Sequence, residues 1–196
     1  MKIDFHTHGK LAKKLPFSKE YTDLLFQKAR KKGLDAICLT EHFNTLSFRD
    51  MYNYIYNEYE HVGDGCQTKD GLFIFFGMEV DIAEGGHTLV IGRYQDIISL
   101  NCLLDDYKQK GCFLPFDRLC ELVKSYDVLF GGAHPFRQGS HIPELSLEQL
   151  NQFDFFDLNG KDLSCNQQQT EMQVSSLATY CHKPVVAGSD THQATQ

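Results

Sequence analysis

The stretch Asp4-Phe5-His6-Thr7-His8 carries the first decisive pattern of the chain. Successive side chains of an extended strand point to opposite faces, so His6 and His8 lie on one face. Two imidazoles placed in this way can bind one divalent cation. Asp4 lies on the same face, where a carboxylate can fix the tautomer of a metal-bound histidine. The motif therefore predicts a strand that contributes two ligands to a metal site.

Working outward from this motif, short apolar runs alternate with longer amphipathic segments. Strands and helices that alternate at this spacing are typical of parallel βαβ units, and therefore of an α/β sheet or a closed barrel. Ser18 is the expected cap of the first helix, and Gly33 its end. The sequence predicts strands over residues 2–6, 35–39, 72–76, 87–92, 128–130, 155–158 and 184–187, and helices over residues 18–32, 48–61, 116–126, 147–152 and 168–180.

Side chains that can bind a metal stand next to nearly every predicted strand. In an α/β barrel the loops after the carboxyl ends of the strands meet at one mouth, so residues distant in sequence gather there. We therefore expect one shared metal site. The residues assigned to it are His6, His8, His42, Glu79, His87, His134, Asp190 and His192.

The other polar residues of these motifs have several possible roles by sequence alone. Glu41 precedes His42 and is interpreted as a ligand, an orienting group or a surface acid. Glu79 ends the most apolar strand, where a carboxylate can bridge two cations, whereas Asp81 is expected in a solvated loop. Arg137 follows a glycine-rich turn with a proline, a place where its guanidinium can clamp an anion or form a surface ion pair.

Composition limits the class of the protein. The chain has 196 residues, 42% of them hydrophobic, which suffices for one domain with its own core. Its formal net charge of -7 predicts that long nucleic acid is an unlikely partner, because nucleic-acid binding relies on clustered lysine and arginine. No apolar stretch is long enough for a membrane span, and the 7 scattered cysteines are typical of reduced thiols. A cytoplasmic protein is expected, and its oligomeric state stays open.

Five motifs together resemble those of the PHP family, the polymerase and histidinol phosphatase domains. They run from Asp4 to His192 in the order Asp-x-His-x-His, Thr-Glu-His, Gly-x-Glu, Ala-His-Pro and Gly-Ser-Asp-x-His. The resemblance implies a distorted seven-stranded (β/α) barrel, similar to a TIM barrel. It implies a single catalytic domain over residues 1–196. The closing helix expected of a complete barrel is not visible after the last strand, so either this element is missing from the sequence or the barrel closes otherwise.

The resemblance also implies two or three divalent cations. Mixed imidazole and carboxylate ligands suit zinc, manganese and iron alike, so the identity of the metal stays open. The resemblance gives Glu79 and Asp190 catalytic roles. By resemblance, the first cation is bound by His6, His8, Glu79 and Asp190, the second by Glu79 as a bridge with His87 and His134, and the third by His42 and His192.

The chain departs from the family pattern just after its first motif. Family members usually supply a further Asp or His there, whereas residues 9–18 contain no such ligand. Lys10 or Lys13 is expected to bring a positive charge to the mouth instead, and Lys10 and Arg137 are assigned to substrate binding. The departure also weakens the case for histidinol phosphate as the substrate.

The expected activity is that of a metal-dependent phosphoesterase, a phosphatase or a phosphodiesterase, acting on a small phosphorylated substrate. Cations about 3.5 to 4 Å apart lower the pKa of bound water toward about 7, so that it can attack phosphorus. Two alternatives stay open. One is a non-catalytic or regulatory metal-binding PHP module, and the other is an amidohydrolase-type enzyme, which would need a modified lysine such as Lys161.

Overall fold

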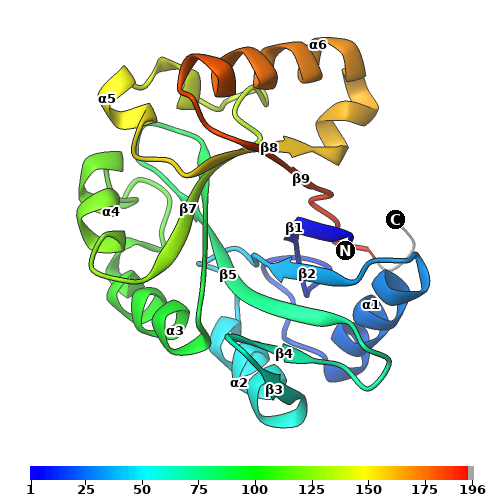
Figure 1. The fold of residues 1–196 in the computed structure, drawn as a ribbon. Coiled ribbons are helices and arrows are strands. Elements are labelled where there is room, and N and C mark those ends of the chain that lie inside the picture. Colours follow the sequence, from blue (N-terminus) through cyan, green and yellow to red (C-terminus); the bar gives the residue numbers. More distant parts are fainter. Residues whose placement is uncertain (194–196) are drawn as a thin grey trace.

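The computed structural model describes residues 1–193 as a mixed sheet that curves almost into a closed barrel, with helices around it (Figure 1). Residues 194–196 of the expected domain lie outside the described part. The prediction of a distorted α/β barrel is confirmed. The strands follow one another around it in the order β1 (Ile3–Thr7), β2 (Ala36–Leu39), β5 (Phe73–Asp81), β6 (His87–Gly92), β7 (Val128–Ala133), β8 (Phe155–Asn159) and β9 (Val185–Gly188).

Backbone hydrogen bonds near the metal-binding motifs join the two ends of this sheet. The N–H of Asp190 donates to the carbonyl of His6 over 2.7 Å, and the N–H of His8 donates to the carbonyl of Thr191 over 3.0 Å. These bonds connect β1 with the loop after β9. The first and the last motif of the sequence are therefore held side by side.

The expectation of purely parallel pairing is wrong around β6. This strand runs antiparallel to both β5 and β7, and the short turn before it uses Gly85 and Gly86 with φ angles of 95° and 119°. A turn of this length can only reverse the chain, because a parallel connection needs a dozen or more residues. The sequence analysis also missed the hairpin of β3 (Glu60–Val62) and β4 (Gly65–Gln67), so His61 lies in a strand and not in a helix.

The helices cover the outside of the barrel. Ser18 caps α1 as expected, since its side chain accepts a hydrogen bond from the N–H of Tyr21. The sequence analysis missed α3 and the first part of α6, a long helix with a kink at Asn166. The helices are α1 (Lys19–Lys31), α2 (Phe48–Glu58), α3 (Tyr94–Leu103), α4 (Phe116–Val123), α5 (Leu147–Leu150) and α6 (Gly160–Tyr180), with 3-10 turns at Asp105–Tyr107 and Ile142–Glu144.

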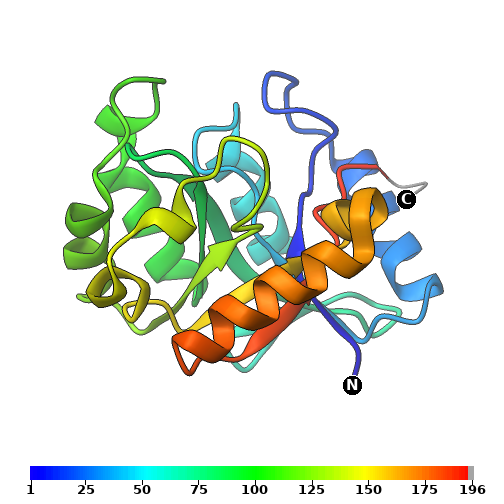
Figure 2. The same ribbon diagram turned by 90° about the horizontal axis from the view of Figure 1, so that it is seen from above.

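Two apolar clusters lie on the two faces of the sheet. The larger one fills the space between strands and helices, and α6 runs along the outside of β8 and β9 (Figure 2). The smaller one lines the barrel interior, with Phe75, Leu89 and Phe155 among its members. Because side chains alternate along a strand, Glu79, two residues beyond Gly77, shares the interior face with Phe75. The interior is thus apolar at its base and polar at its mouth.

Within residues 1–193, no helix is both long enough and apolar enough to cross a bilayer.

A buried tyrosine ties α2 to two strands directly beneath the mouth. Tyr52 has no exposed surface, and its hydroxyl lies 2.8 Å from the carbonyl oxygen of Leu39 and 2.6 Å from that of Gly77. The same oxygen accepts a hydrogen bond from the N–H of Glu41 over 3.3 Å. One hydroxyl therefore satisfies backbone groups of β2, β5 and the loop that carries Glu41 and His42.

Replacing this hydroxyl should destabilise the fold. Tyr52→Phe leaves buried backbone groups without a partner, so we expect the free energy of unfolding to fall by about 1–3 kcal/mol. Urea denaturation followed by circular dichroism measures the change. Tyr180→Phe, at a 63% exposed position, is the matched control. Equal stability of the two variants would contradict this role of Tyr52.

Candidate metal centre

The mouth of the barrel brings together all the residues that the sequence analysis assigned to a metal site. His6, His8, His42, His134 and His192 lie in or just after strands, at the carboxyl edge of the sheet. His87 reaches the same edge from the first position of β6. It can do so because β6 runs antiparallel to its neighbours, which places its amino end beside their carboxyl ends.

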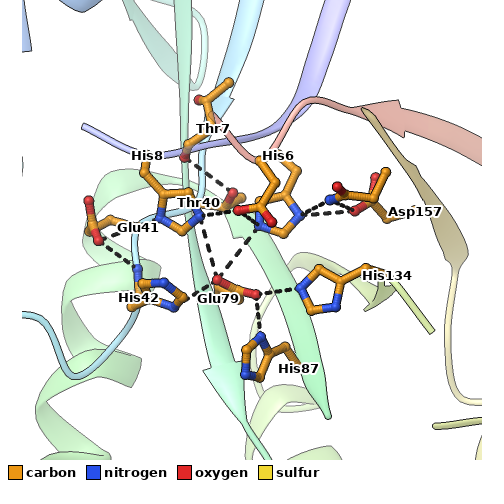
Figure 3. Close-up of polar contacts among 12 residues, drawn as sticks. His6, Thr7, His8, Thr40, Glu41, His42, Glu79, His87, His134 and Asp157 are labelled. Atoms are coloured by element: carbon orange, nitrogen blue, oxygen red, sulfur yellow. Dashed lines mark hydrogen bonds and ion pairs between the residues drawn. The ribbon is translucent and has the colours of Figure 1, made fainter. Parts of the chain in front are cut away.

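Glu79 occupies the middle of this cluster (Figure 3). It is 1% exposed. Its Oε1 lies 2.6 Å from Nδ1 of His87 and 2.9 Å from Nε2 of His134. Its Oε2 lies 2.7 Å from Nδ1 of His42 and 3.6 Å from Nε2 of both His6 and His8. The two oxygens of one carboxylate thus face two different sets of histidines.

Four groups of three side chains have ligand atoms that all lie within 4.8 Å of one another. Each group shares a histidine or Glu79 with another group, so they form one continuous cluster. The groups are His6, His8 and Glu79; Glu79, His87 and His134; His6, His134 and Asp190; and His8, His42 and His192.

Several buried polar atoms in this cluster lack a hydrogen bond to any of residues 1–193. They include Nε2 of His6, Nδ1 of His42 and Oε2 of Glu79. Nδ1 of His42 and Oε2 of Glu79 lie 2.7 Å apart, but the two groups are not aligned as a hydrogen bond. Buried polar groups are normally satisfied, and imidazole nitrogens with carboxylate oxygens are the donor set of zinc, manganese and iron sites. The residues present therefore fit a centre of divalent cations.

The third group differs from the expected one. The family resemblance pairs His42 with His192, and the structure adds His8, whose ring stacks on that of His192 at a centroid distance of 3.9 Å. Burial lowers the pKa of His192 to about 4, so this imidazole is neutral at pH 7 and able to bind a metal. His8 thereby joins His42 and His192 in this group, to which residues 9–18 supply no ligand.

Three carboxylates stand behind the histidines, and the sequence analysis named only Glu41 as a possible orienting group. Asp157 lies 2.9 Å from Nδ1 of His6, and both side chains are fully buried. Asp81 lies 3.1 Å from Nε2 of His87, so the expectation of a solvated loop residue was wrong. Glu41 lies 3.5 Å from Nδ1 of His8. Such partners fix which nitrogen of each histidine faces the cluster.

Asp4 has a different task from the one its position suggested. Its carboxylate accepts hydrogen bonds from the backbone N–H groups of His6, over 3.1 Å, and Ser189, over 2.9 Å. It therefore holds β1 and the end of β9 together, while Asp157 takes the place beside the His6 ring. Alternation from the interior residue Phe155 could have revealed Asp157, but β8 carries no histidine to draw attention to it.

Two ligand candidates have an unusual backbone. The φ angles of His134 and Asp190 are 28° and 56°, in the left-handed region that non-glycine residues rarely adopt. Such a conformation costs on the order of 1–3 kcal/mol and is concentrated at functional sites. The hydrogen bond from Asp190 N–H to the His6 carbonyl stabilises one of the two.

Each of the three nitrogens of the Arg137 guanidinium donates a hydrogen bond to another side chain. Its Nη1 donates to Asp190 over 2.6 Å, its Nη2 to Asn159 over 2.9 Å and its Nε to Asp162 over 2.9 Å. Arg137 was expected to clamp an anion. The structure places it at the mouth, where it orients Asp190 and joins the loop after β7 to the start of α6.

Neither Lys10 nor Lys161 has a free group directed at the cluster. Lys10 is 3% exposed, and its ammonium donates to Oγ1 of Thr45 over 3.0 Å and to the backbone carbonyls of Lys13 and Leu46. It holds two loops together, which disfavours the expected contact with substrate. Lys161 is exposed in the first turn of α6, so the amidohydrolase alternative gains no support.

Removing the charge behind His6 should weaken metal binding. For Asp157→Asn we expect a loss of metal affinity of roughly 10- to 100-fold, the usual effect of losing the partner of a histidine ligand. Titration of chelator-treated protein with Zn²⁺ against a competing dye measures it. Asp106→Asn, at an exposed position, is the control. Unchanged affinity in Asp157→Asn would exclude this role.

Metal binding should also strengthen as the pH rises. Burial lowers the pKa of His87, but Glu79 and Asp81 outweigh it and raise the pKa to about 9. Below that pH a proton must leave the ring before a cation binds. Affinity for Mn²⁺ should therefore increase from pH 6.5 to 8.5, by up to about tenfold per pH unit for each proton released. His87→Asn should flatten this slope. A constant affinity over this range in the unmodified protein would refute the prediction.

Three solved proteins share this fold at low sequence identity. PsfC from Pseudomonas syringae is 23% identical with a TM-score of 0.80, and the match covers 100% of this chain and 79% of PsfC. Endonuclease Q from Pyrococcus furiosus is 20% identical with a TM-score of 0.73, and the match covers 98% of this chain but only 48% of that enzyme. A candidate metal-dependent phosphoesterase from Bifidobacterium adolescentis is 15% identical with a TM-score of 0.62, covering 100% and 89%. No curated protein matches the chain.

The structures of endonuclease Q contradict the expectation that long nucleic acid is an unlikely partner. A second structure of endonuclease Q, with a TM-score of 0.73 and 18% identity, holds a 27-mer duplex with an abasic lesion at the active site. Net charge is a sum over the whole surface, whereas binding depends on the groups near the phosphates. The formal charge of -7 therefore does not exclude nucleic acid.

The sequence model of the PHP domain matches residues 4–173, a range that contains nearly all of the sheet, from β1 to β8. This match supports a metal-dependent hydrolase in general terms. It covers well over half of the 196 residues, and the chain therefore belongs to the PHP domain family.

Proposed function

We propose that this protein is a metal-dependent phosphoesterase whose mouth holds two or three divalent cations. The observation that carries the proposal is the position of Glu79, a buried carboxylate with histidines directed at both of its oxygens. A carboxylate in this position can bridge two cations. Paired cations of this kind are typical of enzymes that cleave phosphate esters.

The four ligand groups suggest how the cations would be distributed. Glu79 belongs to two of the groups and would be the bridge between them. The proposed ligands are His6, His8, Glu79 and Asp190 for the first cation; Glu79, His87 and His134 for the second; and His42 and His192, beside the ring of His8, for the third. When bound, such cations acidify water and neutralise phosphate oxygens.

The residues of the chain keep the two carboxylates of this donor set in the required charge state. Burial alone would raise the pKa of Glu79, but the surrounding histidines hold it well below its usual range. Burial likewise opposes ionisation of Asp190, and its hydrogen bond with His8 keeps its pKa low. Both carboxylates are therefore anionic at pH 7, which supports the proposed catalytic roles of Glu79 and Asp190. Arg137 would act by orienting Asp190.

The fold comparisons are compatible with a phosphate ester as substrate. The endonuclease Q structure contains a DNA duplex at its active site, and the protein from Bifidobacterium adolescentis is named for phosphoester hydrolysis. Both are distant in sequence, so they support the substrate class only by analogy of fold. The donor set of the mouth is the independent support from this chain.

Replacing the bridging carboxylate tests the proposal. Protein purified without chelator should contain two or more metal ions per chain by elemental analysis. It should hydrolyse p-nitrophenyl phosphate or bis(p-nitrophenyl) phosphate when Mn²⁺ or Zn²⁺ is present. In Glu79→Gln we expect turnover to fall by roughly 10²–10³-fold, with an unchanged circular dichroism spectrum.

Glu121→Gln, on the exposed face of α4, is the matched control and should retain full activity. The preferred ester would distinguish a phosphatase from a phosphodiesterase. Stoichiometric metal without turnover of either ester would favour a metal-binding module over an enzyme. Protein without any metal would overturn the assignment of the whole cluster.

A further inference from the structure

Three cationic side chains lie around the mouth, and the structure separates them by what their charged groups already bind. Arg137 uses all three of its nitrogens on Asp190, Asn159 and Asp162. The ammonium of Lys10 is buried among protein oxygens. Lys13 differs from both. Within residues 1–193 its ammonium has one ionic neighbour, at a distance longer than a hydrogen bond.

The backbone of Lys13 is held by hydrogen bonds although its side chain lies partly at the surface. Its carbonyl oxygen accepts hydrogen bonds from the ammonium of Lys10 over 3.3 Å, the hydroxyl of Thr45 over 3.1 Å and the N–H of Leu46 over 2.9 Å. These bonds pin the loop after β1 against the loop after β2. The buried ammonium of Lys10 thus helps to fix the backbone position from which the Lys13 side chain extends.

The side chain of Lys13 reaches the edge of the metal-binding cluster. Its Nζ lies 3.8 Å from Oδ2 of Asp81, and the side chain is 38% exposed. Asp81 contacts Nε2 of His87 through its other oxygen, and His87 contacts Glu79 through Nδ1. One carboxylate and one imidazole therefore separate the ammonium from the centre of the cluster.

The surrounding charges favour an additional anion beside Lys13. A single carboxylate at 3.8 Å leaves the three N–H donors of an ammonium without an aligned acceptor among residues 1–193. His87, which also faces Asp81, shares the negative charge of that carboxylate. A phosphoryl oxygen placed at the mouth would supply the missing acceptor, and charge-assisted hydrogen bonds of this kind are among the strong ones.

We propose that Lys13 is the side chain that binds the phosphoryl oxygens of the substrate, on the β5 side of the mouth, while Arg137 and Lys10 act within the protein. This inference rests on the proposed phosphoesterase function and assigns its substrate contact. Lys13 lies at the edge of the cluster and outside the ligand groups. It should therefore contribute mainly to binding of the phosphate group and leave metal content unchanged.

The test compares Lys13→Gln with Lys14→Gln, which removes the same charge from the adjacent exposed residue. Inorganic phosphate is the probe, and its binding to Mn²⁺-loaded protein is measured by calorimetry and by competitive inhibition. In Lys13→Gln we expect phosphate binding to weaken, and KM to rise, roughly 10- to 100-fold, the effect of losing a charged hydrogen bond. The kcat and the metal content should change by less than about threefold, and Lys13→Arg should restore most of the affinity.

The outcomes separate this inference from the proposed function. Equal phosphate affinity in the unmodified protein, Lys13→Gln and Lys14→Gln would overturn the role of Lys13, whether or not the protein hydrolyses esters. Weaker phosphate binding in Lys13→Gln alone supports it, even if no ester is turned over and the proposed activity fails. Metal-loaded protein that does not bind phosphate at all would reject the inference. A loss of metal from Lys13→Gln would reject it as well.

Discussion

The structure depends on a buried negative charge at Glu79. A carboxylate with 1% exposure is costly unless charged or polar partners surround it, and here histidines approach both of its oxygens. Those histidines come from strands and loops that are far apart in sequence. The sheet must curve until their edges meet, so barrel closure and assembly of the cluster are the same structural requirement.

Close packing of the first and last strands completes this closure. A Cβ at Gly188 would lie 2.3 Å from the Cβ of His6 and 2.6 Å from Oδ1 of Asp157, so only glycine fits between them. Asp4 adds hydrogen bonds to the backbone on both sides of the seam. Oδ1 of Asp157 lies beside Gly188, and its Oδ2 lies 2.9 Å from Nδ1 of His6, so the carboxylate that faces the His6 ring is part of the same packing.

Charges around the mouth are arranged in successive layers. Histidines surround Glu79, carboxylates such as Asp157 and Asp81 stand behind the histidines, and the cations of Lys13 and Arg137 lie beyond them, where they pair with Asp81 and Asp162. Each layer limits the cost of burying the one inside it. This local order explains why net charge was a poor guide to partners. A chain with a formal charge of -7 can still present a site suited to phosphate, because anion binding depends on the nearest groups.

The sequence by itself determined the alternation of strands and helices, the barrel class and the eight side chains that the mouth brings together. The alternation follows from local periodicity, whereas the barrel and the residues of its mouth follow from short motifs that resemble those of the PHP family. Only the tertiary structure decided that β6 is antiparallel, that Asp157 and Asp81 stand behind His6 and His87, and that Lys13 extends to the mouth while Lys10 is buried. The physical reason is that pairing direction and side-chain partners are set by contacts between distant segments, which local pattern does not encode.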